Sequence, residues 1–206
     1  MKPPLPEPLP DDPLPLLAAW MAEAAASIRN SAAMTLATAD ADGRPTARMV
    51  ICRGFDAAGG WLVFYTDRDS DKGRALAARA QAALVFHWDA FERQVRIEGP
   101  VTDAPDADSD RYWNSRPPDA RAAATASAQS RPLGARAELL AKVAAAQGAD
   151  VPRPPRWGGY RVWCERVELW VGQPGRVHDR ARWERTLTAT DGAFAGGRWR
   201  CTRLYP

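Results

Sequence analysis

Short segments with strand character recur along this chain, and the turn signals between them restrict its fold more than any other feature. Three such segments are residues 34–39, 45–53 and 61–66, separated by Asp40-Ala41-Asp42-Gly43 and Ala57-Ala58-Gly59-Gly60. Clusters of this kind favour tight turns, and tight turns join antiparallel strands. Further strands are predicted at 83–88, 93–102, 159–165, 167–171, 177–187 and 198–204. The pattern therefore predicts a meandering antiparallel sheet.

Helical segments interrupt this series of strands. Apolar residues from Leu16 to Ala24 recur at helical spacing after Asp12-Pro13, a pair typical of a helix start, so an amphipathic helix is predicted over 13–29. Further helices are predicted at 70–80, 106–114, 118–128 and 133–147. Strands in a meander with helices inserted between them predict an α+β fold, an antiparallel barrel with peripheral helices.

The domain organisation follows from length and proline content. The chain has 206 residues, and a domain typically holds about 100–200, so residues 13–206 are expected to form one domain. The first fifteen residues contain seven of the 18 prolines. Proline fixes an extended backbone, so residues 1–12 are expected to form an extended, mobile arm.

Several classes of protein are excluded by composition. The 28 basic and 25 acidic residues leave a net charge of +3, too small to indicate a nucleic-acid partner. No apolar run reaches the length of a membrane span, and residues 1–6 lack the apolar stretch of a signal peptide. The three cysteines are widely spaced and form no metal-binding motif. We therefore expect a cytoplasmic protein with no membrane partner and no metal site.

Arginine accounts for 25 of the 28 basic residues, which draws attention to where arginines cluster. GC-rich coding explains part of this excess, but arginine also binds phosphates and carboxylates with two parallel hydrogen bonds. If the segment Arg176–Arg182 is a strand, Arg176, His178, Arg180 and Arg182 project from one face. Such a row indicates either an anionic ligand or a solvated edge strand whose charges pair with neighbouring acids.

Two more clusters carry chemistry suited to phosphate. Tyr112 and Arg116 are four residues apart on a predicted helix, so a phenol and a guanidinium share one face; the alternative is a plain helix end before Pro117. Lys72 stands in the first turn of the predicted helix that Ser70 caps, where backbone N–H groups can receive a phosphate; simple capping is the alternative.

These clusters, in this order, resemble the pyridoxine/pyridoxamine 5′-phosphate oxidase family from about Asp12 to Pro206. The segments that carry the resemblance are Arg48–Arg53, Phe64-Tyr65-Thr66, Glu92-Arg93-Gln94-Val95, Ser115-Arg116-Pro117, Gln129-Ser130, Trp157-Gly158-Gly159-Tyr160 and Arg176-Val177-His178-Asp179-Arg180. Each segment alone is weak, and all of them in order are specific. The resemblance implies a split β-barrel and a homodimer with two FMN sites at the subunit interface. It also implies oxidation of pyridoxamine or pyridoxine 5′-phosphate to pyridoxal 5′-phosphate, with dioxygen as acceptor and peroxide as product.

The resemblance assigns roles to residues of this chain by position. Arg53, Tyr112 and Arg116 match the pocket for the substrate phosphate, and Arg176 and His178 match the catalytic pair that orients the substrate. The positions that match FMN-binding residues are Arg48, Met49, Val50, Ile51, Cys52, Arg53, Tyr65, Thr66, Lys72, Gln94, Gln129, Ser130, Trp170 and Arg180.

Some positions depart from the family pattern. Asp71 stands where the family usually has an arginine at the flavin phosphate, which predicts weaker FMN binding unless another arginine compensates. Arg53 replaces a lysine, Ala120 replaces a serine, and Met1–Pro10 has no counterpart of an Arg-x-x-Tyr lid segment. Two alternatives therefore stay open. One is a related flavin oxidase of another substrate, as in phenazine-type secondary metabolism; the other is a non-catalytic binder of FMN or pyridoxal phosphate.

Overall fold

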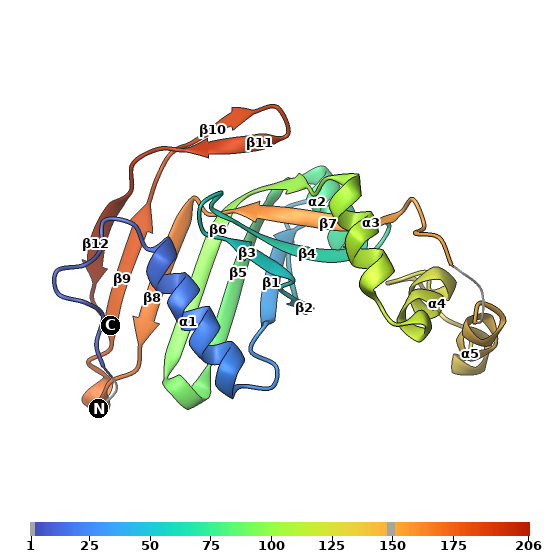
Figure 1. Ribbon diagram of the computed structural model, residues 1–206, viewed down its shortest axis with the longest axis horizontal. Coiled ribbons are helices and arrows are strands. Elements are labelled where there is room, and N and C mark those ends of the chain that lie inside the picture. Colours follow the sequence, from blue (N-terminus) through green and yellow to red (C-terminus); the bar gives the residue numbers. More distant parts are fainter. Residues whose placement is uncertain (1–2, 148–150) are drawn as a thin grey trace.

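The computed structural model describes residues 3–147 and 151–206, which form a curled sheet with helices at its margins (Figure 1). The strands are β1 (Ala33–Ala39), β2 (Pro45–Ile51), β3 (Gly54–Asp56), β4 (Trp61–Asp67), β5 (Gln81–Trp88), β6 (Arg93–Asp103), β7 (Trp157–Trp163), β8 (Arg166–Val171), β9 (Asp179–Glu184), β10 (Leu187–Thr190), β11 (Ala193–Gly196) and β12 (Arg200–Leu204). The long part of the sheet runs β12-β9-β8-β6-β5-β1-β2, and β7 connects β6 to β4 and β3. The pairings along this path are antiparallel, which confirms the predicted antiparallel split barrel. The order is not a simple meander, because β1 pairs with β5 and β6 pairs with β8.

The helices fall close to the predicted segments. They are α1 (Leu14–Ser27), α2 (Asp71–Ala78), α3 (Asp106–Ser115), α4 (Pro118–Ala126) and α5 (Arg136–Ala145), with short 3-10 turns η1 (Asp89–Phe91) and η2 (Pro174–Arg176). In Figure 1, α1 lies across β6 and β8, whereas α4 and α5 lie at the opposite end of the molecule from β9 and β12. Within the described residues, no helix combines the length and apolarity needed to cross a bilayer.

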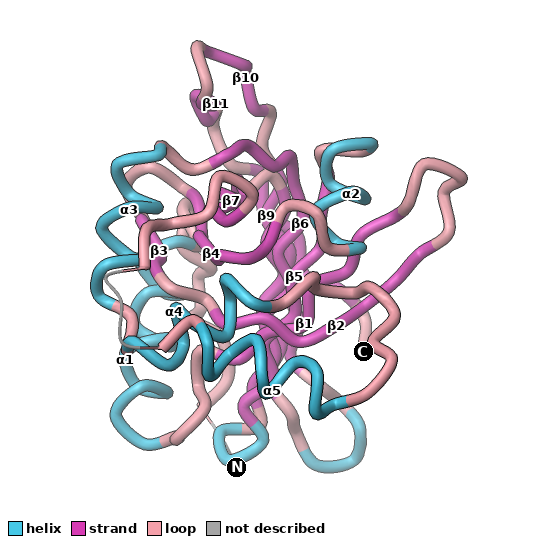
Figure 2. Tube along the Cα trace, turned by 90° about the vertical axis from the view of Figure 1, so that its right-hand side faces the viewer, coloured by secondary structure: helices cyan, strands magenta, loops and turns pink. Residues whose placement is uncertain are grey.

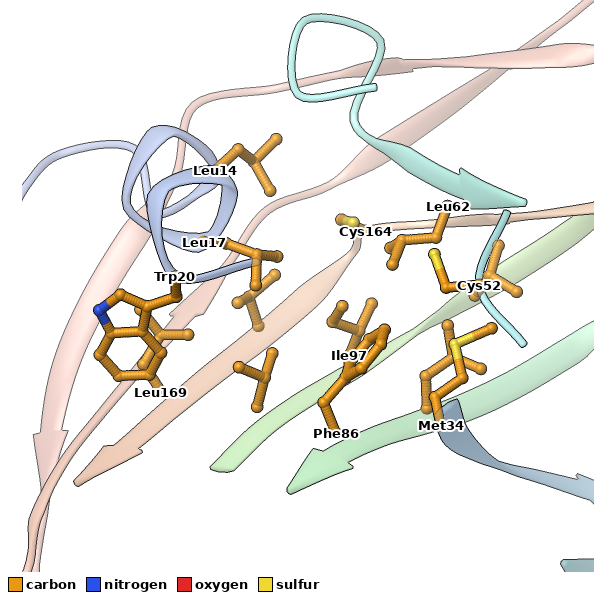
Figure 3. Packing of buried hydrophobic residues seen from close by; sticks show 14 of the residues in the cluster. Leu14, Leu17, Trp20, Met34, Cys52, Leu62, Phe86, Ile97, Cys164 and Leu169 are labelled. Carbon is orange, nitrogen blue, oxygen red and sulfur yellow. The ribbon is translucent and has the colours of Figure 1, made fainter. Parts of the chain in front are cut away.

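The core lies between α1 and the inner face of the sheet (Figure 3). Alternate residues of each strand point inward, so β1 buries Met34 and Leu36 while their neighbours face outward. Leu14, Leu17 and Trp20 close the core from the helix side, because their spacing places them on one face of α1.

The segment predicted as one strand over 177–187 is divided in the structure. Gly175 and Arg176 have φ angles of 68° and 61°, so η2 turns the chain and β9 begins only at Asp179. After Glu184 the chain leaves the sheet and forms the separate hairpin β10–β11, which projects from the molecule (Figures 1 and 2). The prediction of four cationic side chains in one strand row is therefore wrong, because Arg176 and His178 precede the strand that carries Arg180 and Arg182.

The proline-rich arm is held against β9. Leu5 is 3% exposed, and its backbone N–H donates to Asp179 Oδ2 at 2.7 Å. Trp183 Nε1 donates to the Pro10 carbonyl at 2.8 Å. The expected mobile arm instead packs on the sheet, because apolar Leu5 has a buried place there.

Candidate functional site

A buried lysine marks one candidate site, at the start of α2. Lys72 Nζ donates to Thr66 Oγ1 at 3.1 Å, to Ser70 Oγ at 3.0 Å and to Gln129 Oε1 at 3.0 Å. Ser70 also caps α2, which confirms the capping interpretation of this turn. Burial, and next the nearby charge of Arg48, lower the pKa of Lys72. All three acceptors are neutral, so the ammonium charge is not offset by a hydrogen-bonded carboxylate.

Arg48 on β2 is the second cation of this site. Its Nη1 donates to Thr38 Oγ1 at 2.8 Å and to the Leu36 carbonyl at 3.2 Å, again neutral acceptors. Burial lowers its pKa as well. Two desolvated cations close enough to disfavour each other's charge are an arrangement that a bound anion would relieve. The charge of Asp71, which pairs with Arg74, raises the pKa of both cations without cancelling the net lowering, and Asp67 acts on Lys72 in the same direction.

Beside these cations stand three stacked aromatic rings. The centroids of Tyr65 and Tyr112 are 4.3 Å apart, and those of Tyr65 and Trp157 are 5.6 Å apart, with nearly parallel planes. Arg53 lies 5.4 Å from the centroid of Tyr112, and Arg116 lies 4.9 Å from that of Trp157. Burial lowers the pKa of Arg116. The rings thus fix two further guanidinium groups by cation–π contact.

These side chains meet in a cavity of about 310 Å³. The residues that line this cationic cavity are Met49, Val50, Ile51, Arg53, Tyr65, Thr66, Lys72, Tyr112, Arg116, Pro117, Ala120, Gln129 and Trp157. A second cavity of about 490 Å³ beneath α4 and α5 shares Tyr65, Arg116 and Trp157 with it. Most residues predicted from β2, β4 and the helices are therefore brought together. Trp157 was not among the predicted site residues, since nothing in the sequence separates it from a core tryptophan.

Two predicted residues of this region are placed differently. The Cys52 side chain is 7% exposed and donates to the Gly54 carbonyl, and burial raises the pKa of its thiol to about 11. Only the backbone of Cys52 is thus available to a ligand. Ser130 follows Gln129 with a φ of 69°, a conformation that a serine rarely adopts and that is often found at binding sites.

The remaining predicted residues form a second group on the outer face of β6, β8 and β9. Gln94 pairs with Trp170, and Trp170 pairs with Arg180, so these three residues form one cross-strand row, the polar row. The His178 ring lies 4.7 Å from that of Trp170, and His178 Nδ1 accepts from the Gln173 backbone N–H at 3.2 Å. Arg176 is exposed at the left-handed end of η2.

One copy of the chain does not bring the two groups together. The cationic cavity uses β2, at one end of the sheet, whereas the polar row reaches β9, near the other end (Figure 1). At about 4.8 Å between neighbouring strands, the five spacings from β9 to β2 amount to roughly 24 Å along the curled sheet.

Comparison with known families accounts for nearly the whole chain. Residues 21–149 match the family model described as pyridoxamine 5′-phosphate oxidase. Residues 157–206 match the model described as the pyridoxine 5′-phosphate oxidase C-terminal dimerisation region. The cationic cavity thus belongs mostly to the first match, and Trp170, Arg176, His178 and Arg180 belong to the second.

Individual relatives agree with these matches. Pyridoxine/pyridoxamine 5′-phosphate oxidases of Nitrobacter winogradskyi and Sphingopyxis alaskensis are 49% and 50% identical to this chain, covering 95% of it and 90% and 88% of their own lengths. PhzG from Burkholderia lata, solved with tetrahydrophenazine-1-carboxylic acid, is 34% identical with a TM-score of 0.85, covering 96% of this chain and 94% of its own. An FMN-binding protein of Nostoc punctiforme shares the fold, with a TM-score of 0.75 at 18% identity over 94% of this chain and 98% of its own. The chain therefore belongs to the pyridoxine/pyridoxamine 5′-phosphate oxidase family.

Proposed function

We propose that this protein is an FMN-dependent oxidase that converts pyridoxamine or pyridoxine 5′-phosphate to pyridoxal 5′-phosphate, with dioxygen as acceptor and peroxide as product. The observation that carries the proposal is the cationic cavity, which Lys72, Arg53 and Arg116 line, together with Arg48, which precedes the lining residue Met49. None of these four cations forms an ion pair with a carboxylate among the described residues. Cofactor and substrate each bring a phosphate, so four such cations have two dianions to neutralise.

The residues divide into two sets by the phosphate that each would hold. Arg48 and Lys72, with Thr66 and Gln129, would bind the FMN phosphate, because the half-buried Arg48 and the buried Lys72 are neighbouring cations that bond only neutral acceptors. Arg53, Arg116 and Tyr112 would bind the substrate phosphate beside the stacked rings. FMN, when bound, supplies the hydride acceptor for the C4′ carbon of the substrate and is reoxidised by dioxygen.

Arg176 and His178 would orient the substrate. Because His178 Nδ1 accepts the Gln173 N–H, a neutral His178 carries its proton on Nε2 and offers a hydrogen-bond donor there. The neighbouring Trp170 ring restricts the imidazole plane. The proposed role of the pair is to hold C4′ in reach of the cofactor, which is a positioning contribution to rate.

The proposal includes a homodimer whose sites lie between the subunits. A second copy would supply the polar row, Arg176 and His178 opposite the cationic cavity, and the match to a dimerisation region supports this assembly. Exposed apolar residues at the cavity also support it, since Met49 and Ile51 on β2 are 61% and 40% exposed.

A related oxidase acting on an unphosphorylated ring acid is the second candidate. The likeness to PhzG, solved with a tricyclic carboxylic acid, favours it, as does the larger cavity beneath α4 and α5 beside Arg116. A guanidinium binds a carboxylate as readily as a phosphate.

One experiment separates these functions. Purified protein is saturated with FMN and given pyridoxamine 5′-phosphate in air, and formation of peroxide and of aldehyde is followed. Stoichiometric production of both is expected. Absence of turnover at saturating FMN contradicts the proposed reaction. Tightly bound FMN that this substrate does not reduce, but a dihydro-ring acid does, would favour the second candidate; reduction by neither would favour a non-catalytic binder.

A further inference from the structure

A buried carboxylate on the outer face of the sheet has no part in the function proposed above. Glu168 on β8 is 5% exposed, although it lies on the same face as the half-buried Trp170. Its Oε1 accepts from Arg180 Nε at 3.1 Å and from Arg180 Nη2 at 2.8 Å. Its Oε2 lies 3.4 Å from Arg96 Nη1. Keeping a carboxylate this deeply buried requires such paired cations, because an unpaired buried charge is costly.

Glu168 holds a residue of the polar row. In the register, Gln94, Trp170 and Arg180 stand side by side, and Arg96, Glu168 and Arg182 form the next row. Glu168 therefore reaches Arg180 diagonally, from one row to the other. The Tyr205 carbonyl accepts from Arg180 Nη1 at 3.0 Å, so the guanidinium is fixed from two sides.

The charge environment of Arg180 differs from that of the cationic cavity. Arg48 and Lys72 bond neutral acceptors, whereas Arg180 makes a two-point bond to a carboxylate. Of the five N–H donors of an arginine, Arg180 uses three on Glu168 and Tyr205, leaving one on each Nη nitrogen. When a carboxylate already offsets its charge, an arginine serves a ligand as an oriented hydrogen-bond donor more than as a counter-ion to the ligand's charge.

We propose that Glu168 is a positioning residue of the cofactor site: it fixes the guanidinium of Arg180 and offsets its charge, so that Arg180 presents two oriented donors to the flavin. This inference rests on the proposed function, because that proposal makes Arg180 a cofactor-binding residue. Glu168 itself touches neither cofactor nor substrate.

The test measures flavin affinity rather than turnover. Apoprotein is titrated with FMN and the quenching of flavin fluorescence gives Kd for the wild type, Glu168→Gln, Arg180→Ala and the double variant. Glu168→Gln is expected to weaken FMN binding roughly tenfold, the range expected for losing one charge-assisted hydrogen bond. The double variant is expected to bind no more weakly than Arg180→Ala, because Glu168 acts through Arg180.

Matched controls separate positioning from general destabilisation. Glu184→Gln removes a carboxylate of the neighbouring row that bonds Arg166 and Arg182 but not Arg180, and its Kd is expected to be unchanged. Arg96→Gln tests the other partner of Glu168 and is expected to have a smaller effect than Glu168→Gln. Thermal melting of each apoprotein reports whether it is folded.

The outcomes distinguish this inference from the proposed function. If Arg180→Ala leaves Kd unchanged, the assignment of Arg180 to the cofactor fails, and the inference about Glu168 falls with it. If Arg180→Ala weakens binding but Glu168→Gln does not, or weakens it equally with and without Arg180, only the role of Glu168 is overturned. Should Glu168→Gln not fold, Glu168→Asp replaces it. That variant keeps the charge but withdraws the carboxylate by one methylene, and an unchanged Kd overturns the proposal too.

Discussion

At the scale of single residues, the structure separates arginines that pair with acids from arginines and a lysine that do not. Arg180 and Arg182 bond Glu168 and Glu184, whereas Arg48 and Lys72 bond hydroxyl, amide and carbonyl oxygens. The sequence indicated which cations matter, through their order along the chain. It could not indicate which of them are neutralised, because that depends on which strands become neighbours.

Replacing Lys72 should change stability and FMN binding in opposite directions. We expect Lys72→Met to weaken FMN binding by about tenfold or more, since a charge-assisted bond is lost. We also expect it to raise the unfolding temperature of the apoprotein, because burial and Arg48 disfavour the charged lysine in the folded state.

The pH dependence of the higher stability of Lys72→Met follows from the direction in which folding changes the pKa of Lys72. The folded-state pKa of Lys72 is lowered, so the unfolded chain binds more protons between the two pKa values, and wild-type stability rises with pH there. The advantage of Lys72→Met should be full at neutral pH and shrink as alkaline pH passes through the lowered pKa. Melting curves of both apoproteins from neutral to alkaline pH check this, and an advantage that grows with pH would contradict it.

The substrate-orienting pair gives a second prediction at this scale. Arg176→Ala and His178→Ala should each lower kcat/KM by roughly ten- to a hundredfold while FMN affinity stays nearly constant, because both are assigned to the substrate. Arg44→Ala is the matched control, because Arg44 is another exposed turn arginine and contacts Asp40 and Asp42 of its own turn. Unchanged kcat/KM in either variant would show that the role assignment is wrong.

At the scale of elements, strand periodicity predicted the sheet well and failed where backbone conformation interrupts a strand. The strand expected over 93–102 is present as β6, and Gln94 and Arg96 lie on its outer face. The strand expected over 177–187 failed because Gly175 and Arg176 take left-handed conformations before it. Pro174-Gly175 is itself a turn signal, so the earlier end of that strand could have been placed from sequence. The exit after Glu184 into β10–β11 had no comparable signal.

The hairpin β10–β11 should be dispensable for the site. Its strands pair only with each other in the described part of the sheet, and Phe194 makes an edge contact with Trp163 at 5.7 Å. We expect that replacing residues 188–195 with a two-residue Asn-Gly turn leaves FMN affinity and kcat/KM within about twofold of wild type, because surface loops tolerate such changes. Loss of flavin binding in a folded deletion variant would assign the hairpin a role at the site.

At the scale of the whole molecule, the predicted site residues fall into two groups, the cationic cavity and the polar row, which involve opposite ends of the sheet. The motifs could be recognised from the sequence because members of a family keep them in the same order. The distance between two motifs across the sheet could not be predicted, because it depends on the order of the strands in the sheet. The path from β9 to β2 passes through β8, β6, β5 and β1, and this separates Arg180 on β9 from the residues of β2 that line the cationic cavity. A homodimer resolves the separation only if each site takes the cationic cavity from one protomer and Arg176 and His178 from its partner.

This arrangement in trans predicts complementation between two impaired variants, assayed at an FMN concentration that saturates the wild type but not Lys72→Met. Lys72→Met and His178→Ala homodimers each carry one defect in both sites. In a mixed dimer, one site collects both defects and the other collects neither. Random exchange of equal amounts makes half of the dimers mixed, so about a quarter of all sites regain wild-type composition. Turnover of pyridoxamine 5′-phosphate is therefore expected to rise toward about a quarter of the wild-type rate after mild dissociation and reassociation, with each variant treated alone as the control. A mixture that exchanges subunits by native mass spectrometry yet stays as impaired as its parents would place Lys72 and His178 in the same protomer's site, and the proposed sharing of each site between two subunits would have to be abandoned.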